Sequence, residues 1–179
     1  MFLIALALAA TQAEPAFPAG PPGRAEPAPQ PMTVEVVRDA ITDRLRATAI
    51  LRANGERIEI RCRAPDWGDV SVQYHSRRWI ARGNFLTGQQ PVTYRFDDHA
   101  PIRRLWRVHD RTARFDERGR VIAFVGALMN ARSLVLRTRD IENRTFDAVF
   151  PIGETRGAIV ELLHTCGSSR INPYIIGKQ

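Results

Sequence analysis

The chain has 179 residues, a hydrophobic fraction of 44% and a formal net charge of +7, with a pI near 10.6. This length suits one domain with short appendages, and this hydrophobic fraction excludes a wholly disordered chain. Lys178 is the only lysine, and arginines occur in nearly every segment. Because these arginines fall mostly on the polar phase of alternating patterns, they favour solvated strand faces over a specific nucleic-acid site. Binding to an anionic polymer stays open.

The N-terminal segment has the pattern of an export signal. Met1–Ala10 is an apolar run of the length of a signal-peptide core and is too short to span a bilayer. Small residues follow at Thr11 and Ala13, so we predict a signal peptide over 1–13, cleaved after about Ala13, and a periplasmic or secreted location. A buried N-terminal strand and a wrongly assigned start of the chain are the alternatives. Residues 14–32, rich in Pro, Ala and Gly, predict an extended linker.

The first part of the folded region has strand periodicity. A short strand is expected near Val34 and Val36, and residues 45–52 then alternate between apolar and polar side chains. Asn54-Gly55 predicts a tight turn that couples this strand to the next, over 58–62, because both residues tolerate positive φ. Residues 70–74 predict a third alternating strand.

Further along, Pro91–Asp110 contains two strand-like runs around a carboxylate-rich turn, which is the pattern of a β-hairpin. The remaining expected elements are a strand at 112–116, a helix at Arg120–Ala131, strands at 133–139 and 146–150, and a helix at Gly153–Thr165 with Gly167 as its C-terminal cap. Many strands with only two helices predict an α+β fold: an antiparallel sheet or sandwich of about 7–9 strands with two packing helices. We place a single domain at 33–167 and a C-terminal tail at 168–179.

Cys62 and Cys166 are the only cysteines. In an exported chain an even number of cysteines favours a disulfide, which here would close a loop of roughly 100 residues. Two separate buried thiols are the alternative.

The densest polar chemistry lies at the tip of the 91–110 hairpin. Adjacent residues on a strand point to opposite faces, so Asp97, Asp98 and His99 do not converge readily on one metal ion. The four histidines fall in different elements, and no catalytic or nucleotide-binding motif is present. We therefore predict no enzymatic site, no metal and no cofactor, and expect the tip to be a turn or a contact surface. The predicted contact residues are Tyr94, Arg95, Asp97, Asp98, His99, Trp106, Arg77 and Arg78. Trp67, Trp79 and Trp106 would either line an aromatic groove or pack in the core.

The order of these features resembles the type VI secretion system-associated TagO (VasI) family of exported bacterial proteins. The matching positions are Ile58, Ile60 and Cys62; Val92, Tyr94, Arg95, Asp97 and Asp98; Trp106; Leu134, Leu136 and Arg137; Ala148 and Phe150; and Ile159, Leu162, Leu163 and Cys166. The chain lacks the Arg-Leu-x-Cys-Tyr-Asp segment that family members commonly carry upstream. The resemblance implies an accessory protein of the envelope without an established enzymatic site, and a structural Cys62–Cys166 disulfide.

We accordingly predict a non-enzymatic adaptor that acts through protein contacts at the bacterial cell envelope, with an envelope or secretion-system protein as partner. One alternative is a cell-wall enzyme or enzyme inhibitor that uses the 94–99 tip with Arg77 and Arg78. Another is an arginine-driven binder of anionic polymers. The sequence leaves the oligomeric state open.

Overall fold

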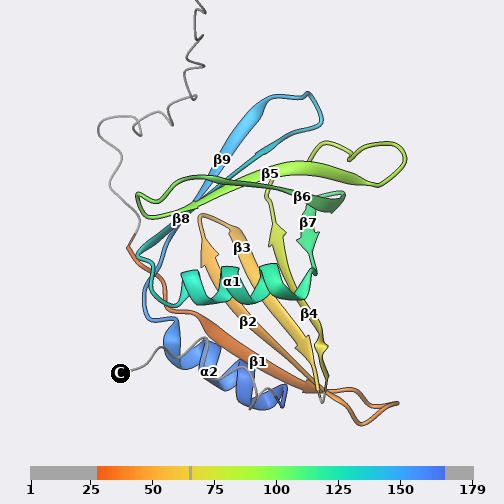
Figure 1. Ribbon diagram of the computed structural model, residues 1–179, viewed down its shortest axis with the longest axis vertical. Helices are drawn as coiled ribbons and strands as arrows, with labels where there is room; N and C mark the ends of the chain where they lie inside the picture. Colours follow the sequence, from red (N-terminus) through yellow and green to blue (C-terminus); the bar gives the residue numbers. More distant parts are fainter. Residues whose placement is uncertain (1–27, 65, 168–179) are drawn as a thin grey trace, which may run out of the picture.

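The computed structural model describes residues 28–64 and 66–167, which form one antiparallel sheet of nine strands and two helices (Figure 1). The strands are β1 (Thr33–Arg38), β2 (Leu45–Ala53), β3 (Glu56–Arg63), β4 (Asp66–His75), β5 (Gln89–Phe96), β6 (Ile102–His109), β7 (Thr112–Phe115), β8 (Ser133–Arg139) and β9 (Thr145–Pro151); the helices are α1 (Arg118–Leu128) and α2 (Arg156–Thr165). Their order across the sheet is β1-β2-β3-β4-β7-β6-β5-β8-β9. The predicted α+β class with an antiparallel sheet and two helices is confirmed.

The sheet curls so that its two halves face each other around α1 (Figure 1). α2 packs on β1 and β2, α1 packs on β4, and β9 comes back into contact with β2. The inner face holds the core, which includes Ile58 and Ile60 of β3 and an aromatic cluster of Tyr94, Phe96, Trp106, Phe115 and Phe124. Because side chains alternate across a strand, the residues between these positions form a second, outer face.

The turn at Asn54-Gly55 forms as predicted. Both residues have positive φ, 52° and 76°, and β2 and β3 pair in register up to Ala53 and Glu56. This geometry matches the right-handed twist of the strands that the turn connects. The same turn therefore sets which residues of β3 face the core and which face outward.

The 91–110 hairpin is also confirmed, as β5 and β6 pair antiparallel from Gln89–Arg107 to Tyr94–Ile102. The expected strand at 112–116 is β7, which pairs with both β6 and β4. β7 therefore joins the half of the sheet formed by β1–β4 to the half formed by β6, β5, β8 and β9.

Both helices differ from their predicted bounds. α1 begins two residues before Arg120 and ends three before Ala131, and the Asn130 side chain donates to the Gly126 carbonyl oxygen beyond the last turn. α2 begins at Arg156 instead of Gly153, because Gly153 hydrogen-bonds to Gln30 and the Glu154 carboxylate accepts from the first backbone N–H groups of the helix. Gly167 has φ 70°, as expected for a C-terminal cap.

The end of the predicted 14–32 linker belongs to the fold. Gln30 bridges to Ile152, and Met32 is buried and donates its N–H to the Glu154 carbonyl oxygen. The predicted signal peptide, the linker up to residue 27 and the 168–179 tail lie outside the described residues. Neither helix within residues 28–64 and 66–167 is long and apolar enough to cross a membrane.

Cys62 and Cys166 form a disulfide that links β3 to the end of α2, with their Cα atoms 6.2 Å apart. The sulfur atoms lie in the core, since both cysteines are almost fully buried. The alternative of two separate buried thiols is wrong.

Candidate functional site

The outer face of β1–β4 and β7 is polar, and its geometry follows from the strand register. Cys62 and Ile60 lie on the face that α2 covers, so Arg57, Glu59 and Arg61 project from the opposite face of β3. Glu59 pairs with Gln73 of β4, and Gln73 pairs in turn with Arg114 of β7. Charged and amide side chains from three strands therefore lie in one row across the outer face.

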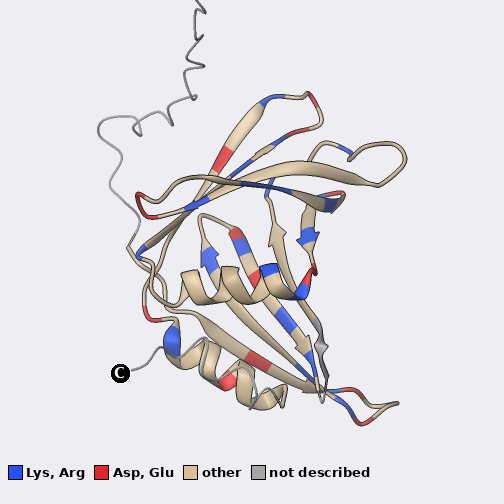
Figure 2. Cartoon of the chain, viewed as in Figure 1, with Lys and Arg blue, Asp and Glu red and all other residues tan. Residues whose placement is uncertain are grey.

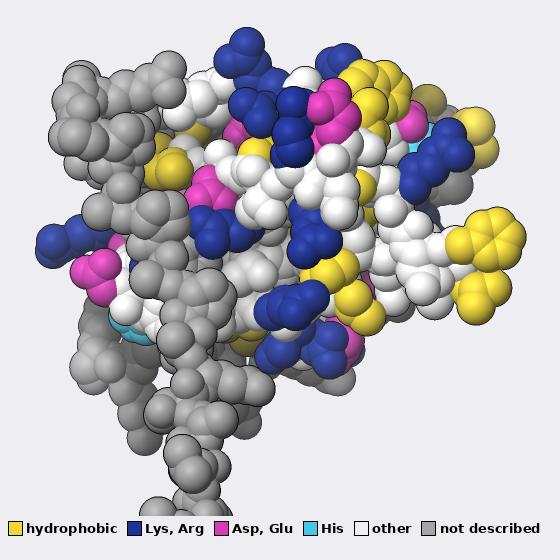
Figure 3. Space-filling model, turned by 90° about the horizontal axis from the view of Figure 1, so that it is seen from above, with side chains coloured by type: hydrophobic (Ala, Val, Ile, Leu, Met, Phe, Trp, Pro, Cys, Tyr) yellow, Lys and Arg dark blue, Asp and Glu magenta, His cyan; other side chains and the backbone are white. Residues whose placement is uncertain are grey.

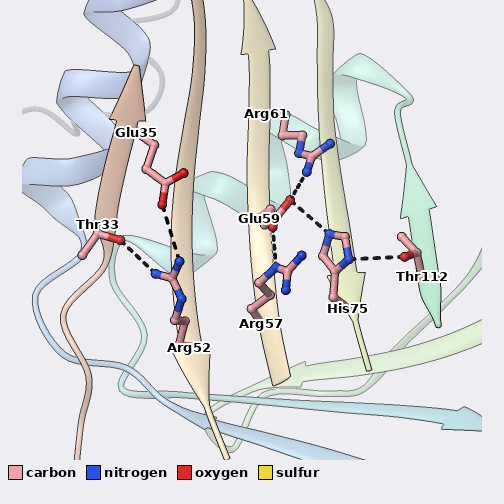
Figure 4. A network of polar contacts seen from close by, with 8 residues as sticks. All are labelled: Thr33, Glu35, Arg52, Arg57, Glu59, Arg61, His75 and Thr112. Carbon is pink, nitrogen blue, oxygen red and sulfur yellow. Dashed lines mark hydrogen bonds and ion pairs between the residues drawn. The ribbon is translucent and has the colours of Figure 1, made fainter. Parts of the chain in front are cut away.

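Glu59 is the centre of a polar network on this face (Figure 4). Its carboxylate accepts from Arg57 Nε at 2.5 Å, and it lies 2.6 Å from an Arg61 guanidinium nitrogen and 3.0 Å from His75 Nε2. His75 Nδ1 is 3.2 Å from the Thr112 hydroxyl. The side chain of Glu59 is only 4% exposed, because the guanidinium groups of both arginines cover it.

This environment keeps Glu59 ionised. Burial by itself would raise the pKa of the carboxyl group, but hydrogen bonds from His75 and Arg57 and the charge of Arg61 outweigh it and lower the pKa to about 2. Glu59 is therefore a carboxylate throughout the neutral range and holds the two arginines on the outer face.

The order of hydroxyl, imidazole and carboxylate in Thr112, His75 and Glu59 resembles that of a hydrolytic triad. In such a triad the carboxylate stabilises the imidazolium that forms during the reaction. Here the carboxylate already neutralises two guanidinium groups, so it is committed to holding positive charge in the ground state. We interpret this network as a support for the arginines.

A cleft of about 490 Å³ opens beside this network. Arg46, Arg61, Arg63 and Arg114 line it together with Glu35, and Ser71 and Gln73 contribute polar side chains from β4. Ser71 and Gln73 are 2% and 8% exposed, and neither side chain hydrogen-bonds to a described residue. The cleft thus combines guanidinium groups with hydroxyl and amide donors, which is the chemistry that holds an oxyanion.

Two carboxylates at this face are each shared between two arginines. Glu59 contacts both Arg57 and Arg61, and Asp116 lies 3.5 Å from both Arg107 and Arg114. Figure 2 shows basic positions along β2, β3 and β7, with acidic positions between them on β3 and beside them on β1. Arg46 has its own carboxylate partner in Asp39, but in the other two groups one negative charge offsets two positive ones, so Arg61 and Arg114 bring excess positive charge to the cleft.

Two predicted contact residues lie in the core instead of on the surface. Trp106 is fully buried with its ring 4.5 Å from that of Phe115, and Tyr94 is 5% exposed with its ring 5.2 Å from that of Phe124. Both sit on the inner face of the hairpin, where α1 covers them. Their assignment to a contact surface is corrected accordingly. The side chain of Trp67 lies outside the described part of the chain.

The other predicted contact residues are dispersed. Asp98 and His99 are exposed at the β5–β6 turn, and Arg95 is half-buried on β5. Arg77 donates to the Asn54 carbonyl oxygen at the β2–β3 turn, and the Arg78 guanidinium lies 5.3 Å from the centre of the Phe146 ring. Within the described residues, no contact joins Arg77 or Arg78 to the 97–99 turn, so these residues do not form one site.

Asp97 has a structural role at this turn. It has φ 47°, and its carboxylate accepts from the backbone N–H groups of Arg132 and Ser133 at 2.9 and 2.8 Å and from the Ser133 hydroxyl at 3.2 Å. Burial would raise the pKa of Asp97, but these hydrogen bonds outweigh it and hold the pKa below its ordinary value. The carboxylate therefore ties the hairpin tip to the start of β8.

Replacing Asp97 with alanine is expected to lower the free energy of unfolding by about 2 kcal/mol, because two backbone N–H groups and the Ser133 hydroxyl lose a charged acceptor. Asp98→Ala, one position along on the exposed side of the turn, should change it by less than about 0.5 kcal/mol. Urea unfolding measures both. Equal effects of the two substitutions would contradict the structural role of Asp97.

Sequence reasoning missed Glu59 and His75. Glu59 stands among arginines at alternate positions of one strand, which by itself indicates a solvated face. Only the register of β3, β4 and β7 brings His75 and Thr112 next to it. The available signal was a single acidic residue flanked by arginines two positions away on each side.

The described residues contain no group of three His, Cys, Asp or Glu side chains placed to hold a metal ion. Comparison of the chain with protein-family models, with curated proteins and with solved structures found no match.

Proposed function

We propose that this protein is an exported, non-enzymatic accessory protein of the cell envelope that binds an acidic segment of a partner protein in the arginine-lined cleft. The observation that carries the proposal is the composition of the cleft. Four arginines line it, two of them share their carboxylate with another arginine, and the neutral polar side chains of Ser71 and Gln73 on β4 open onto it.

The spacing of the arginines favours a peptide. Arg61 and Arg63 lie two positions apart on β3 and project from the same face, so their Cα atoms are separated by about 6.8 Å. An extended peptide with acidic residues at alternate positions repeats its carboxylates at about the same spacing. The guanidinium fork matches a carboxylate in a bidentate arrangement, and Ser71 and Gln73 are placed to donate to its remaining lone pairs.

Three further features support an envelope location. The disulfide is typical of proteins in oxidising compartments. The apolar N-terminal run has the pattern of an export signal. The resemblance to the TagO family adds an association with a type VI secretion system to the proposal.

Calorimetric titration with a ten-residue peptide of alternating Glu and Ser tests the cleft. We expect saturable binding that weakens between low and high salt, because the charges are partly exposed. Arg114→Gln should weaken binding about fivefold, equivalent to about 1 kcal/mol. Arg103→Gln removes an exposed arginine of β6 that lies outside the cleft, and should leave the affinity unchanged.

Two comparisons distinguish the peptide from other ligands. A peptide with the same glutamates in one block should bind more weakly, because its charges do not repeat at the strand spacing. Linear polyphosphate of equal charge should also bind more weakly. Tighter binding of polyphosphate would contradict the acidic-partner proposal and favour an anionic polymer. An equal loss of affinity in Arg103→Gln and Arg114→Gln would show attraction by overall charge alone.

A further inference from the structure

The loop between Ile80 and Gln89 presents two large apolar side chains to solvent. Phe85 is 99% exposed and Leu86 is 85% exposed. Scattered single apolar residues are common on protein surfaces. Two adjacent large ones with almost none of their area buried indicate a surface that a partner covers.

This exposure belongs to a hydrogen-bonded turn. The Leu86 N–H donates to Asn84 Oδ1 at 2.8 Å, the Gly88 N–H donates to the Asn84 carbonyl oxygen at 2.7 Å, and the Asn84 N–H donates to the Gln89 carbonyl oxygen at 2.6 Å. At Gly83 a Cβ atom would lie 2.2 Å from the backbone of Gly88, so the two ends of the loop close tightly on each other. Asn84 and the glycines thus build a turn that directs Phe85 and Leu86 outward.

The loop lies beside two other turns at one end of the molecule. The Ala81 N–H donates to the Arg139 carbonyl oxygen at 2.8 Å, and the Ile80 N–H donates to the Asp110 carbonyl oxygen at 2.9 Å. The first bond places the loop next to the β8–β9 turn, where Ile141 is 64% exposed. The second places it next to the β6–β7 turn at Asp110. Trp79, which precedes Ile80, is 47% exposed. The loop and the β8–β9 turn both lie at the upper right of Figure 1.

Arginines lie beside these apolar residues, and the two carboxylates that flank Ile141, Asp140 and Glu142, both form ion pairs with Arg144. Arg82, Arg111 and Arg139 have no carboxylate partner among the described residues, and the Arg111 guanidinium lies 5.0 Å from the centre of the Trp79 ring. From above, apolar side chains project from this end next to basic ones (Figure 3). We name this surface the apolar end; it comprises Trp79, Phe85, Leu86 and Ile141 with Arg82, Arg111 and Arg139.

We infer that the apolar end docks on the surface of an anionic lipid bilayer, with Phe85 and Leu86 inserted at the boundary of the acyl chains. A bilayer accepts projecting apolar side chains at its interface, and the arginines then lie at the level of the anionic headgroups. Trp79 suits the same depth, because an indole is stable where an apolar and a wet environment meet. The apolar residues and the positive charge together match this one occupant. The inference is independent of the peptide cleft.

Co-sedimentation with lipid vesicles tests this inference. The intact protein should bind vesicles that contain about 30% phosphatidylglycerol in phosphatidylcholine, and should bind pure phosphatidylcholine vesicles much more weakly. Phe85→Ser combined with Leu86→Ser should weaken binding about tenfold or more. Ile41→Ser is the matched control, because Ile41 is 94% exposed at the β1–β2 turn, at the bottom of Figure 1.

Quenching of tryptophan fluorescence by brominated lipids adds a second readout. Quenching in the wild-type protein that is lost in Trp79→Phe would support insertion at this end. Equal binding of the double variant and the wild type, or equal binding to both kinds of vesicle, would overturn the inference. A wild-type dimer that becomes a monomer in the double variant would overturn it in favour of a second copy of the chain. Arg114→Gln should not change vesicle binding, which separates this result from the cleft.

Discussion

Replacing Cys62 and Cys166 together with alanine is expected to lower the free energy of unfolding by about 4 to 5 kcal/mol. The disulfide closes a loop with a sequence separation of 104 residues, which includes every strand from β4 to β9 and both helices. Without the cross-link the unfolded chain gains conformational entropy, and this stabilises the unfolded state relative to the folded one. Urea unfolding of the double variant, compared with the wild type under oxidising conditions, measures the difference.

Reduction of the wild-type protein provides the control for this prediction. With dithiothreitol present, the wild type should lose most of its advantage over the Cys62→Ala/Cys166→Ala variant, because only the cross-link distinguishes the two chains strongly. The N-terminal strands should be affected most, since α2 packs on β1 and β2. An unchanged midpoint after complete reduction would contradict the stabilising role of the disulfide.

Glu59→Gln is expected to destabilise the protein by about 3 kcal/mol at neutral pH, the free energy that corresponds to the lowered pKa of Glu59. The folded pKa of about 2 lies below the ordinary value of 4.5, so the ionised carboxylate stabilises the folded state. This stabilisation is fully present above pH 4.5 and is lost as the pH falls toward 2. The difference between wild type and Glu59→Gln should therefore be constant above about pH 5 and shrink toward zero near pH 2.

Glu35→Gln is the control for Glu59. Glu35 lies on the same outer face but is largely exposed, and its one ion pair with Arg52 is 3.5 Å long. Such a pair contributes less than about 1 kcal/mol, so this variant should unfold nearly as the wild type does. A pH-independent difference between wild type and Glu59→Gln would show that the effect comes from packing and would contradict the electrostatic role.

Alternation in the sequence predicts most of the strands, because a half-buried strand must place every second side chain in the core. Asn54-Gly55 predicts one hairpin register, since few residue pairs tolerate positive φ at both positions. The order of the strands was not predictable in this way. β7 pairs with β4 across more than thirty intervening residues, and no local pattern indicates that pairing.

The arginine-lined cleft was missed for the same physical reason. Asp97, Asp98 and His99 attract attention because they are adjacent in the sequence, but left-handed backbone at Asp97 turns its carboxylate toward Ser133. The residues that line the cleft come from separate strands and become neighbours only through cross-strand register. In the sequence, the dispersed arginines indicate a solvated surface. Only the fold shows that pairs of arginines share one carboxylate, which leaves part of the arginine charge unbalanced.

We propose that the cleft on the outer face of β1–β4 and β7 binds an acidic peptide. NMR spectra of the arginine Nε–H groups, recorded while the alternating Glu-Ser peptide is added, test it most directly. The cleft predicts saturable shifts of Arg46, Arg61 and Arg114, and no shift of Arg103 on β6. Shifts spread evenly over all exposed arginines, or confined to residues outside the cleft, would contradict it.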